Sequence, residues 1–197
     1  MKGREIMHTE KEIEFKNLLT KDEFQKLVKH FNIKQSEFQM QTNYYFDTPN
    51  HYFKNNKMGF RLRVLPTRNE LTLKVPEKEH VMNETTHLLS NIDRDNILNN
   101  LQFPSAPFLQ QIENEGPLAC IGSMQTNRAQ ICYESGLLFF DHSIYSHTED
   151  FEVEYESKDV ENGRKKFLQL LTNHEIPLRN TDKKIARLVN YNNSLKG

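Results

Sequence analysis

The chain has 197 residues, a formal net charge of −1 at pH 7 and a sequence pI near 6.7. Hydrophobic residues make up 36% of it and charged residues 27%, which supports a folded core and excludes a disordered or collagen-like chain. The longest uncharged apolar run, 137–140, is far too short to span a bilayer, and the chain lacks the basic excess of nucleic-acid binders. We therefore expect a soluble cytoplasmic protein with one domain over residues 1–197 and no membrane or nucleic-acid partner; monomer and homodimer both stay open.

The first half of the chain alternates between strand and helix patterns. Strict alternation of polar and apolar residues over 12–16 predicts a strand. Thr20 and Glu23 form a capping box in front of apolar residues spaced three and four apart, which predicts a helix. Asp47-Thr48-Pro49 is typical of a turn that ends a strand. Further strands are expected at 39–47, 60–64, 71–75 and 84–89.

The second half of the chain is predicted to place strands between helices. A helix is expected at 93–101, and another from Ser105 to a point before Gly116. Gly163 interrupts a later helical pattern at a cost of roughly 1 kcal/mol relative to alanine, so packing must hold it there. The remaining predicted elements are strands at 118–125, 127–134, 137–142 and 151–155 and helices at 159–173 and 182–190.

Eight or nine strands with short turns between them predict an antiparallel sheet that is large enough to close. Its charged face is either the solvent side of an open sheet or the inside of a barrel. The apolar faces of the helices need a sheet to cover, which favours the barrel. We therefore expect an α+β fold: a closed antiparallel β-barrel tunnel of eight (or nine) strands with helices packed outside. The positions expected under helices are Ile13, Phe15, Leu62, Leu71, Leu73 and Val153.

The charged face of the predicted strands combines long acids with long bases. Arginine and lysine bind phosphate oxygens, and clustered carboxylates are costly unless a cation lies between them. Mg²⁺ and Mn²⁺ accept both carboxylate and phosphate oxygens, so this set suits a metal–polyphosphate complex, although its charges could also cancel as salt bridges. The residues are Glu12, Glu14, Lys16, Arg61, Arg63, Lys74, Arg128, Asp141, Glu152 and Glu154.

The order of these residues resembles a known family. Glu12-x-Glu14-x-Lys16 is similar to the ExExK signature of the CYTH domain, the triphosphate tunnel metalloenzyme family. The chain departs from the family at His142, where a base is usual, and it has adjacent lysines at 183 and 184, of which we favour Lys184. The other matching segments, in the family's order across nearly the whole chain, are 43–49, 61–63, 71–74, Arg128, Asp141, 152–154 and 184–187.

The resemblance implies a metal-dependent enzyme that hydrolyses the terminal phosphate of a triphosphate, with inorganic tripolyphosphate as the first candidate. A nucleoside or thiamine triphosphatase, an adenylate cyclase and a non-catalytic polyphosphate- or nucleotide-binding module are the alternatives. Mg²⁺ or Mn²⁺ would be held by Glu12, Glu14, Asp141, Glu152 and Glu154. The substrate would be bound by Lys16, Arg61, Arg63, Lys74, Arg128 and Lys184.

Within this set, the resemblance assigns the catalytic roles to Glu154 and Lys184. Tyr44 and Tyr45 point to opposite faces of their strand, so one of them could face the tunnel, but packing in the core is the favoured interpretation for this pair. Like charges held close together disfavour ionisation. We therefore also expect the acids to repel one another in the metal-free protein, so that replacing Glu12 or Glu154 by glutamine costs little stability.

Overall fold

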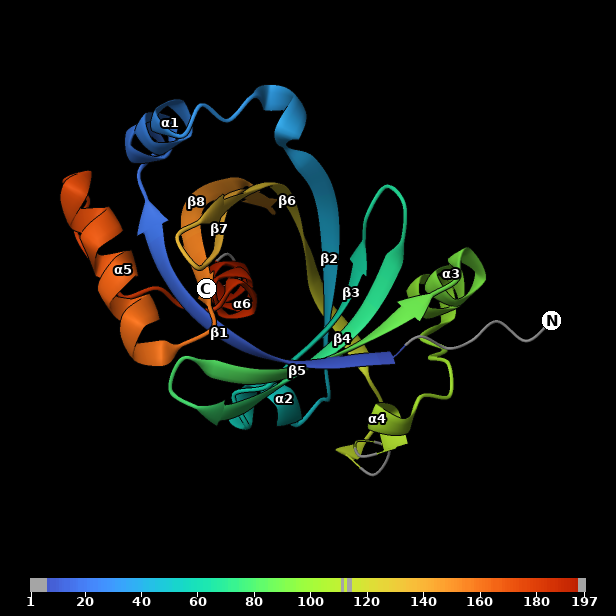
Figure 1. The fold of residues 1–197 in the computed structure, drawn as a ribbon. Helices are drawn as coiled ribbons and strands as arrows, with labels where there is room; N and C mark the ends of the chain where they lie inside the picture. The colour runs from blue at the N-terminus through green and yellow to red at the C-terminus, as the bar shows by residue number, and fades with distance from the viewer. Residues whose placement is uncertain (1–6, 111, 113–114, 195–197) are drawn as a thin grey trace. The chain divides into compact units, whose positions relative to one another are not determined.

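The computed structural model describes residues 7–110, 112 and 115–194. The described strands are β1 (Met7–Leu19), β2 (Gln39–Asp47), β3 (Gly59–Val64), β4 (Asn69–Lys78), β5 (Val81–Leu89), β6 (Ala119–Tyr133), β7 (Gly136–Tyr145) and β8 (Thr148–Ser157). The described helices are α1 (Lys21–His30), the 3-10 helix η1 (Gln35–Glu37), α2 (Tyr52–Asn55), α3 (Asn91–Asn100), α4 (Pro107–Gln110), α5 (Val160–Asn173) and α6 (Lys184–Ser194) (Figure 1).

The strands form a closed antiparallel barrel in the order β1-β5-β4-β3-β2-β6-β7-β8. Because the hydrogen-bonded order returns to its start, no strand is left as a free edge. The predicted α+β fold is confirmed, with eight strands in the described part of the chain rather than nine. No helix in that part is long and apolar enough to cross a membrane.

Three differences from the predicted elements concern local boundaries. The strands expected at 118–125 and 127–134 are one continuous strand, β6, because neither glycine nor proline interrupts the chain between 123 and 133. The helix expected from Ser105 is limited to the single turn of α4; residues 111 and 113–114, where it was expected to continue, lie outside the described residues. The short helices α2 and η1 were not predicted, since three or four residues carry no periodic signal.

The chain divides into two compact units, each with its own core. Unit 1 contains the residues up to Lys11, Thr42–Glu77 and Met82–Ser123, and unit 2 contains Glu12–Gln41, Lys78–Val81 and the residues from Met124 onward.

The core of unit 1 lies between one face of β3 and β4 and the helices α2, α3 and α4. Leu62 and Leu71, which are directly opposite each other in the sheet, are fully buried there. Phe53 of α2 stacks on Phe60 of β3 with ring centroids 5.4 Å apart. The Asp47 carboxylate ends β2 as predicted, because it accepts hydrogen bonds from the backbone N–H groups of Thr48, Phe53 and Lys54 at the start of α2.

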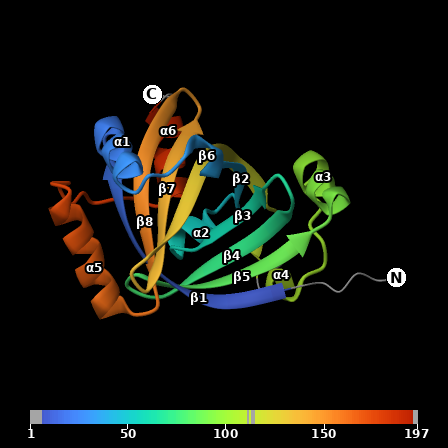
Figure 2. The ribbon, with the colours of Figure 1, turned by 45° about the horizontal axis from the view of Figure 1, so that its top comes forward.

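The core of unit 2 lies between the apolar face of its sheet and the helices α1 and α5, which both flank β1 and β8 in Figures 1 and 2. Phe15 of β1 and Val153 of β8 are buried against Leu27 of α1 and Phe167 of α5. The predicted capping box of α1 is present, with the Thr20 hydroxyl and the Glu23 carboxylate each accepting a backbone N–H. The apolar residues expected under helices all belong to the two cores or pack against them.

Gly163 lets α5 approach β1 and β8 closely. A Cβ atom at this position would lie 2.6 Å from Ser157 Cβ and 2.8 Å from Phe15 Cε2, distances that real Cβ atoms essentially never show. Packing therefore does hold the glycine inside the helix, as the sequence requires.

Replacing Gly163 by alanine is therefore expected to destabilise the protein by up to about 2 kcal/mol. Alanine gains about 1 kcal/mol of helix propensity, but overpacking costs about 1–3 kcal/mol. Urea unfolding measures the difference. Gln169→Ala, an exposed substitution on the same helix, is the control and should change the free energy of unfolding by less than about 0.5 kcal/mol. A stabilised Gly163→Ala protein would contradict this account of the α5 contact.

Candidate functional site

The polar face of unit 2 is built by β6, β7, β8 and β1. Arg128 lies opposite Asp141 in the antiparallel register, and Asp141 lies opposite Glu152 on the next strand. Lys16 of β1 lies opposite Glu154 on the other side of β8. Since directly opposite residues of an antiparallel pair share a face, these five charged side chains project from one face of the sheet.

Three carboxylates meet on this face. One oxygen each of Asp141, Glu152 and Glu154 lies within 4.8 Å of the others. Asp141 and Glu152 are 0% exposed and Glu154 is 4% exposed. Glu152 Oε1 is buried without a hydrogen-bond partner in the described part of the chain. Carboxylates buried this closely require positive charge beside them.

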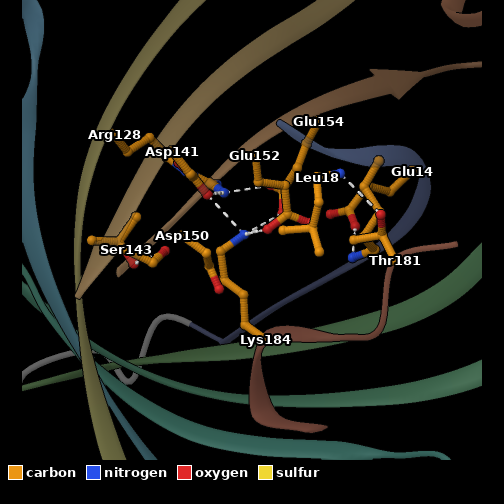
Figure 3. A network of polar contacts seen from close by, with 12 residues as sticks. Glu14, Leu18, Arg128, Asp141, Ser143, Asp150, Glu152, Glu154, Thr181 and Lys184 are labelled. Atoms are coloured by element: carbon orange, nitrogen blue, oxygen red, sulfur yellow. Dashed lines mark hydrogen bonds and ion pairs between the residues drawn. The ribbon is translucent and has the colours of Figure 1, made fainter. Parts of the chain in front are cut away.

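Lys184, the first residue of α6, supplies part of that charge. Its Nζ lies 2.8 Å from Asp141 Oδ2, 2.6 Å from Glu152 Oε2 and 2.5 Å from Glu154 Oε1 (Figure 3). Lys184, the residue of the adjacent pair that the sequence analysis favours, thus contacts all three acids.

Arg128 of β6 is the second counterion. Its Nε and Nη2 atoms donate to the two oxygens of Asp141 at 2.7 and 2.6 Å, and Nη2 also pairs with Glu154. Phe139 of β7 supports the guanidinium, whose carbon lies 4.6 Å from the ring centroid. The planar fork of arginine matches a carboxylate in a way that lysine cannot copy, so Arg128 fixes the orientation of Asp141.

Arg187 extends the network along β8. Its Nη2 lies 2.7 Å from Glu152 Oε2, and its Nε lies 2.9 Å from Asp150 Oδ2. Asp150 also accepts a hydrogen bond of 2.9 Å from the Tyr145 hydroxyl. The sequence analysis included Arg187 in a motif without giving it a site role. The available signal was its spacing, because a residue three positions after Lys184 shares its helix face.

The cations keep the buried acids ionised. Burial by itself raises the pKa of Asp141 and Glu154, but Lys184 and Arg128 outweigh it and hold both pKa values below their ordinary range. Burial likewise lowers the pKa of Lys184, and the surrounding carboxylates raise it well above its ordinary value. The premise that the acids repel one another without opposing charge in the metal-free protein is therefore wrong, because cations contact all three; losing Glu154 would leave excess positive charge beside Lys184 and Arg128.

The first motif of the sequence, on β1, borders this network. Lys16 forms an ion pair with Glu14, and burial, which lowers the pKa of Lys16, is outweighed by Glu14 and Glu154. The backbone N–H of Glu14 donates to the carbonyl of His80 at the tip of the β4–β5 hairpin. Glu12 lies two residues earlier on the same strand face and is half-buried. Neither Glu12 nor Glu14 belongs to the group of three acids among the described residues.

Unit 1 contains a second charged group, formed by β3, β4 and β5. Glu84 Oε2 lies 2.6 Å from Lys74 Nζ, and Glu84 Oε1 lies 3.8 Å from Arg61 Nη2. Burial raises the pKa of Glu84, but Lys74, Arg61 and Arg63 outweigh it and lower the pKa to about 2. The sequence analysis did not single out Glu84, because the residues around it do not alternate regularly and so do not show to which face of the strand Glu84 points.

The two tyrosines of β2 separate as expected of adjacent strand residues. Tyr44 is opposite Leu62 and packs against the apolar core of unit 1, whereas Tyr45 is opposite Arg61 and shares its face. Arg63 is held on that face by a hydrogen bond of 2.9 Å from its Nε to Asn43 Oδ1. Tyr45 is therefore the tyrosine on the charged side of the strand.

Comparison with known sequences identifies the family. The sequence profile of the CYTH domain matches residues 10–189. The chain belongs to the CYTH domain family. The chain is similar to the proposed triphosphatase YjbK of Bacillus subtilis (strain 168), with 36% identity over 185 residues that cover 92% of this chain and 95% of YjbK.

Solved CYTH-type structures share the fold. A proposed adenylate cyclase of Bacillus halodurans has a TM-score of 0.86 and 32% identity, over 91% of this chain and 97% of its own. A proposed adenylyl cyclase of Hippeastrum, whose dominant activity is that of a triphosphatase, has a TM-score of 0.73 and 20% identity, over 89% and 93%. The second likeness concerns the fold alone.

The Glu84 group predicts an acid-dependent loss of stability. Because the folded-state pKa of about 2 lies below the ordinary value of 4.5, the contribution is present above pH 4.5 and is lost as the pH falls towards 2. The shift corresponds to about 3 kcal/mol. We expect wild type and Glu84→Gln to differ by about this free energy of unfolding in urea at pH 7 and to converge as the pH falls from 5 towards 2. A difference that stays constant over this range would show that the carboxylate does not titrate in this way.

Proposed function

We propose that this CYTH protein hydrolyses the terminal phosphate of a triphosphate with the help of a divalent cation, and that inorganic tripolyphosphate is its substrate. The observation that carries the proposal is the buried group of Asp141, Glu152 and Glu154 with Lys184 and Arg128 in direct contact. The similarity to YjbK supports the reaction class. The family match over residues 10–189 supports our treating the chain as one catalytic domain.

The acidic group fits a divalent cation such as Mg²⁺ or Mn²⁺. Its donors are all carboxylate oxygens, the ligand type that both ions prefer. Glu152 Oε1 is buried and has no hydrogen-bond partner among the residues that the structure describes, which is costly unless a further ligand satisfies it. We propose Asp141, Glu152 and Glu154 as the ligands, with Glu12 and Glu14 of β1 as additional acids. When bound, such an ion supplies positive charge that polarises phosphoryl oxygens.

The cations of the network would act directly on the substrate. Lys184 and Arg128 already lie against the acids, so a phosphate chain that arrives with its own counterion can exchange carboxylate contacts for phosphate contacts. Lys16 adds a third positive charge from β1. These groups would stabilise the negative charge that moves to the bridging oxygen as the terminal P–O bond breaks, a role that needs no covalent intermediate. Glu154 would accept a hydrogen bond from the attacking water and orient it.

The basic residues of unit 1 are proposed as phosphate-binding groups. Arg61 and Arg63 are two residues apart on one strand face, and Lys74 lies on the adjacent strand. Arg63 is pre-oriented by Asn43, which lowers the entropy lost when its fork binds an anion. Such a row suits an extended polyanion better than a single phosphate, which supports tripolyphosphate as the substrate.

The assay that tests the function measures phosphate release from tripolyphosphate, ATP and thiamine triphosphate with Mg²⁺, Mn²⁺ or a chelator. We expect release from tripolyphosphate to be fastest and to stop in the chelator. Cyclic AMP formed from ATP would point to a cyclase instead. Binding of the three anions without release under every metal condition would point to a non-catalytic binding module.

Glu152→Gln is expected to abolish metal-dependent phosphate release and to weaken Mn²⁺ binding at least roughly tenfold in calorimetry, since a lost ligand should cost no less than a lost supporting residue. Glu134→Gln is the matched control, because Glu134 is an exposed acid paired with Lys166 outside the cluster. Unchanged Mn²⁺ affinity in Glu152→Gln would refute the assignment of the metal site, whether or not the protein proves to be active.

Arg63→Lys is expected to weaken tripolyphosphate binding by at least about tenfold although the charge is kept, because a charge-assisted contact contributes about 1.5–3 kcal/mol and lysine lacks the fork. Calorimetry in calcium, used to block turnover, should rank wild-type affinity as tripolyphosphate, then pyrophosphate, then phosphate. Arg68→Lys, at an exposed arginine paired with Glu70, is the control. Equal affinity for the three anions would exclude an extended phosphate site.

A further inference from the structure

The segment between α5 and α6 is fastened to the end of β1. We call residues 177–181 the strap. Every second residue of the strap, namely Pro177, Arg179 and Thr181, forms hydrogen bonds with residues 17–23, at the end of β1 and the start of α1. The strap precedes Lys184, the residue that contacts all three buried acids.

Asn17 ties the backbone of the strap to β1. Asn17 is 0% exposed, and both polar atoms of its side-chain amide bind the strap. Oδ1 accepts a hydrogen bond from the backbone N–H of Arg179 at 2.6 Å, and Nδ2 donates one to the carbonyl of Pro177 at 3.1 Å. Thr181 adds a third tie, since its hydroxyl accepts the backbone N–H of Leu18 at 3.0 Å. An amide buried with both of its polar atoms satisfied makes a specific, rigid attachment.

Arg179 locks the strap from its other side. Its Nη1 donates to the carbonyl of Leu18 and to Glu23 Oε2, each at 2.8 Å, while Nη2 donates to Glu23 Oε1 at 2.8 Å. The same Glu23 carboxylate caps α1 by accepting the backbone N–H of Thr20. The bidentate pair therefore joins the strap to a residue that is itself fixed by its helix.

The strap shortens the free chain that carries Lys184. Lys184 lies eleven residues beyond Asn173, the end of α5, but only three residues beyond Thr181. The probability that the end of a flexible chain lies at a given point falls with about the three-halves power of the chain length. Shortening the free chain from eleven residues to three by fastening it at Thr181 therefore raises the probability of the observed Lys184 placement roughly sevenfold.

We propose that Arg179 and Asn17 are positioning residues for Lys184. By fastening the strap, they hold the Lys184 ammonium beside the buried carboxylates and, when substrate is bound, beside its terminal phosphate. This inference rests on the proposed function for its catalytic part, since Lys184 is the group that would contact substrate. Among the described residues, the hydrogen bonds of the Arg179 and Asn17 side chains go to backbone groups and to Glu23.

The first test is a double-mutant cycle on phosphate release from tripolyphosphate. Arg179→Gln removes the fork but leaves the ties of Asn17 and Thr181, so kcat/KM should fall by roughly twofold or more but by less than the full tether effect of about sevenfold. In a Lys184→Ala background the same substitution should have no further effect, and Arg179→Lys should recover part of the loss. Equal losses in both backgrounds would overturn the proposal, because they would show an effect that does not pass through Lys184.

The second test does not depend on activity. Hydrogen exchange of Arg179→Gln should be faster at the α6 amides and unchanged at those of β7 and β8, whereas Lys166→Gln, at a surface ion pair on α5, should match wild type throughout. Unchanged exchange in α6 would overturn the positioning role. If Arg179→Gln fails to fold, Thr181→Ala takes its place with the same criteria. A wild-type protein inactive on every triphosphate would refute the proposed function, while the exchange result would still decide whether the strap holds α6.

Discussion

The arrangement of unit 2 depends on the neutralisation of three carboxylates buried together. Removing Asp141, Glu152 and Glu154 from water is costly, and the cost is met only if cations with well-directed hydrogen bonds lie within contact distance. One such cation, Arg128, comes from the neighbouring strand, and another, Lys184, comes from α6. The sheet thus needs the helix for electrostatic reasons: α6 is held by ion pairs on the polar face, whereas α1 and α5 are held by burial of apolar side chains on the other face.

Much of the fold was predictable because successive residues of a strand point to opposite faces, so the sequence alternates with a period of two. Phe15 and Val153 follow the apolar phase, and Glu14 and Glu154 follow the charged phase, so knowing the strands almost fixes which side chains share a face. The resemblance to the CYTH family ordered the charged positions along the chain. The structure brings Asp141, Glu152 and Glu154 into one group, as this ordering implied.

The features that the sequence did not predict depend on contacts between residues that lie far apart in the chain. The contact of Lys184 with the acids depends on where α6 lies against β7 and β8, which no local sequence pattern gives. Glu84 was missed because its strand has no regular alternation that would show it sharing a face with Lys74 and Arg61. The error about repelling acids has the same origin, since charge alternation on a strand shows which acids are close but not that Lys184 lies between them.

The pairing of the two ends of the chain bears on how the protein is made. Glu23 and Arg179 are 156 residues apart, and Phe15 pairs across the sheet with Tyr155. During synthesis β1 therefore emerges long before its partner strand β8, and contacts of such long range form slowly because loop closure comes first. A nascent chain that ends before Lys184 already contains the three acids and Arg128 but lacks the lysine that contacts all three. Premature termination near the C-terminus would thus yield a chain with most of its core residues and an incompletely neutralised acidic group, a candidate for quality-control degradation rather than a partly active product.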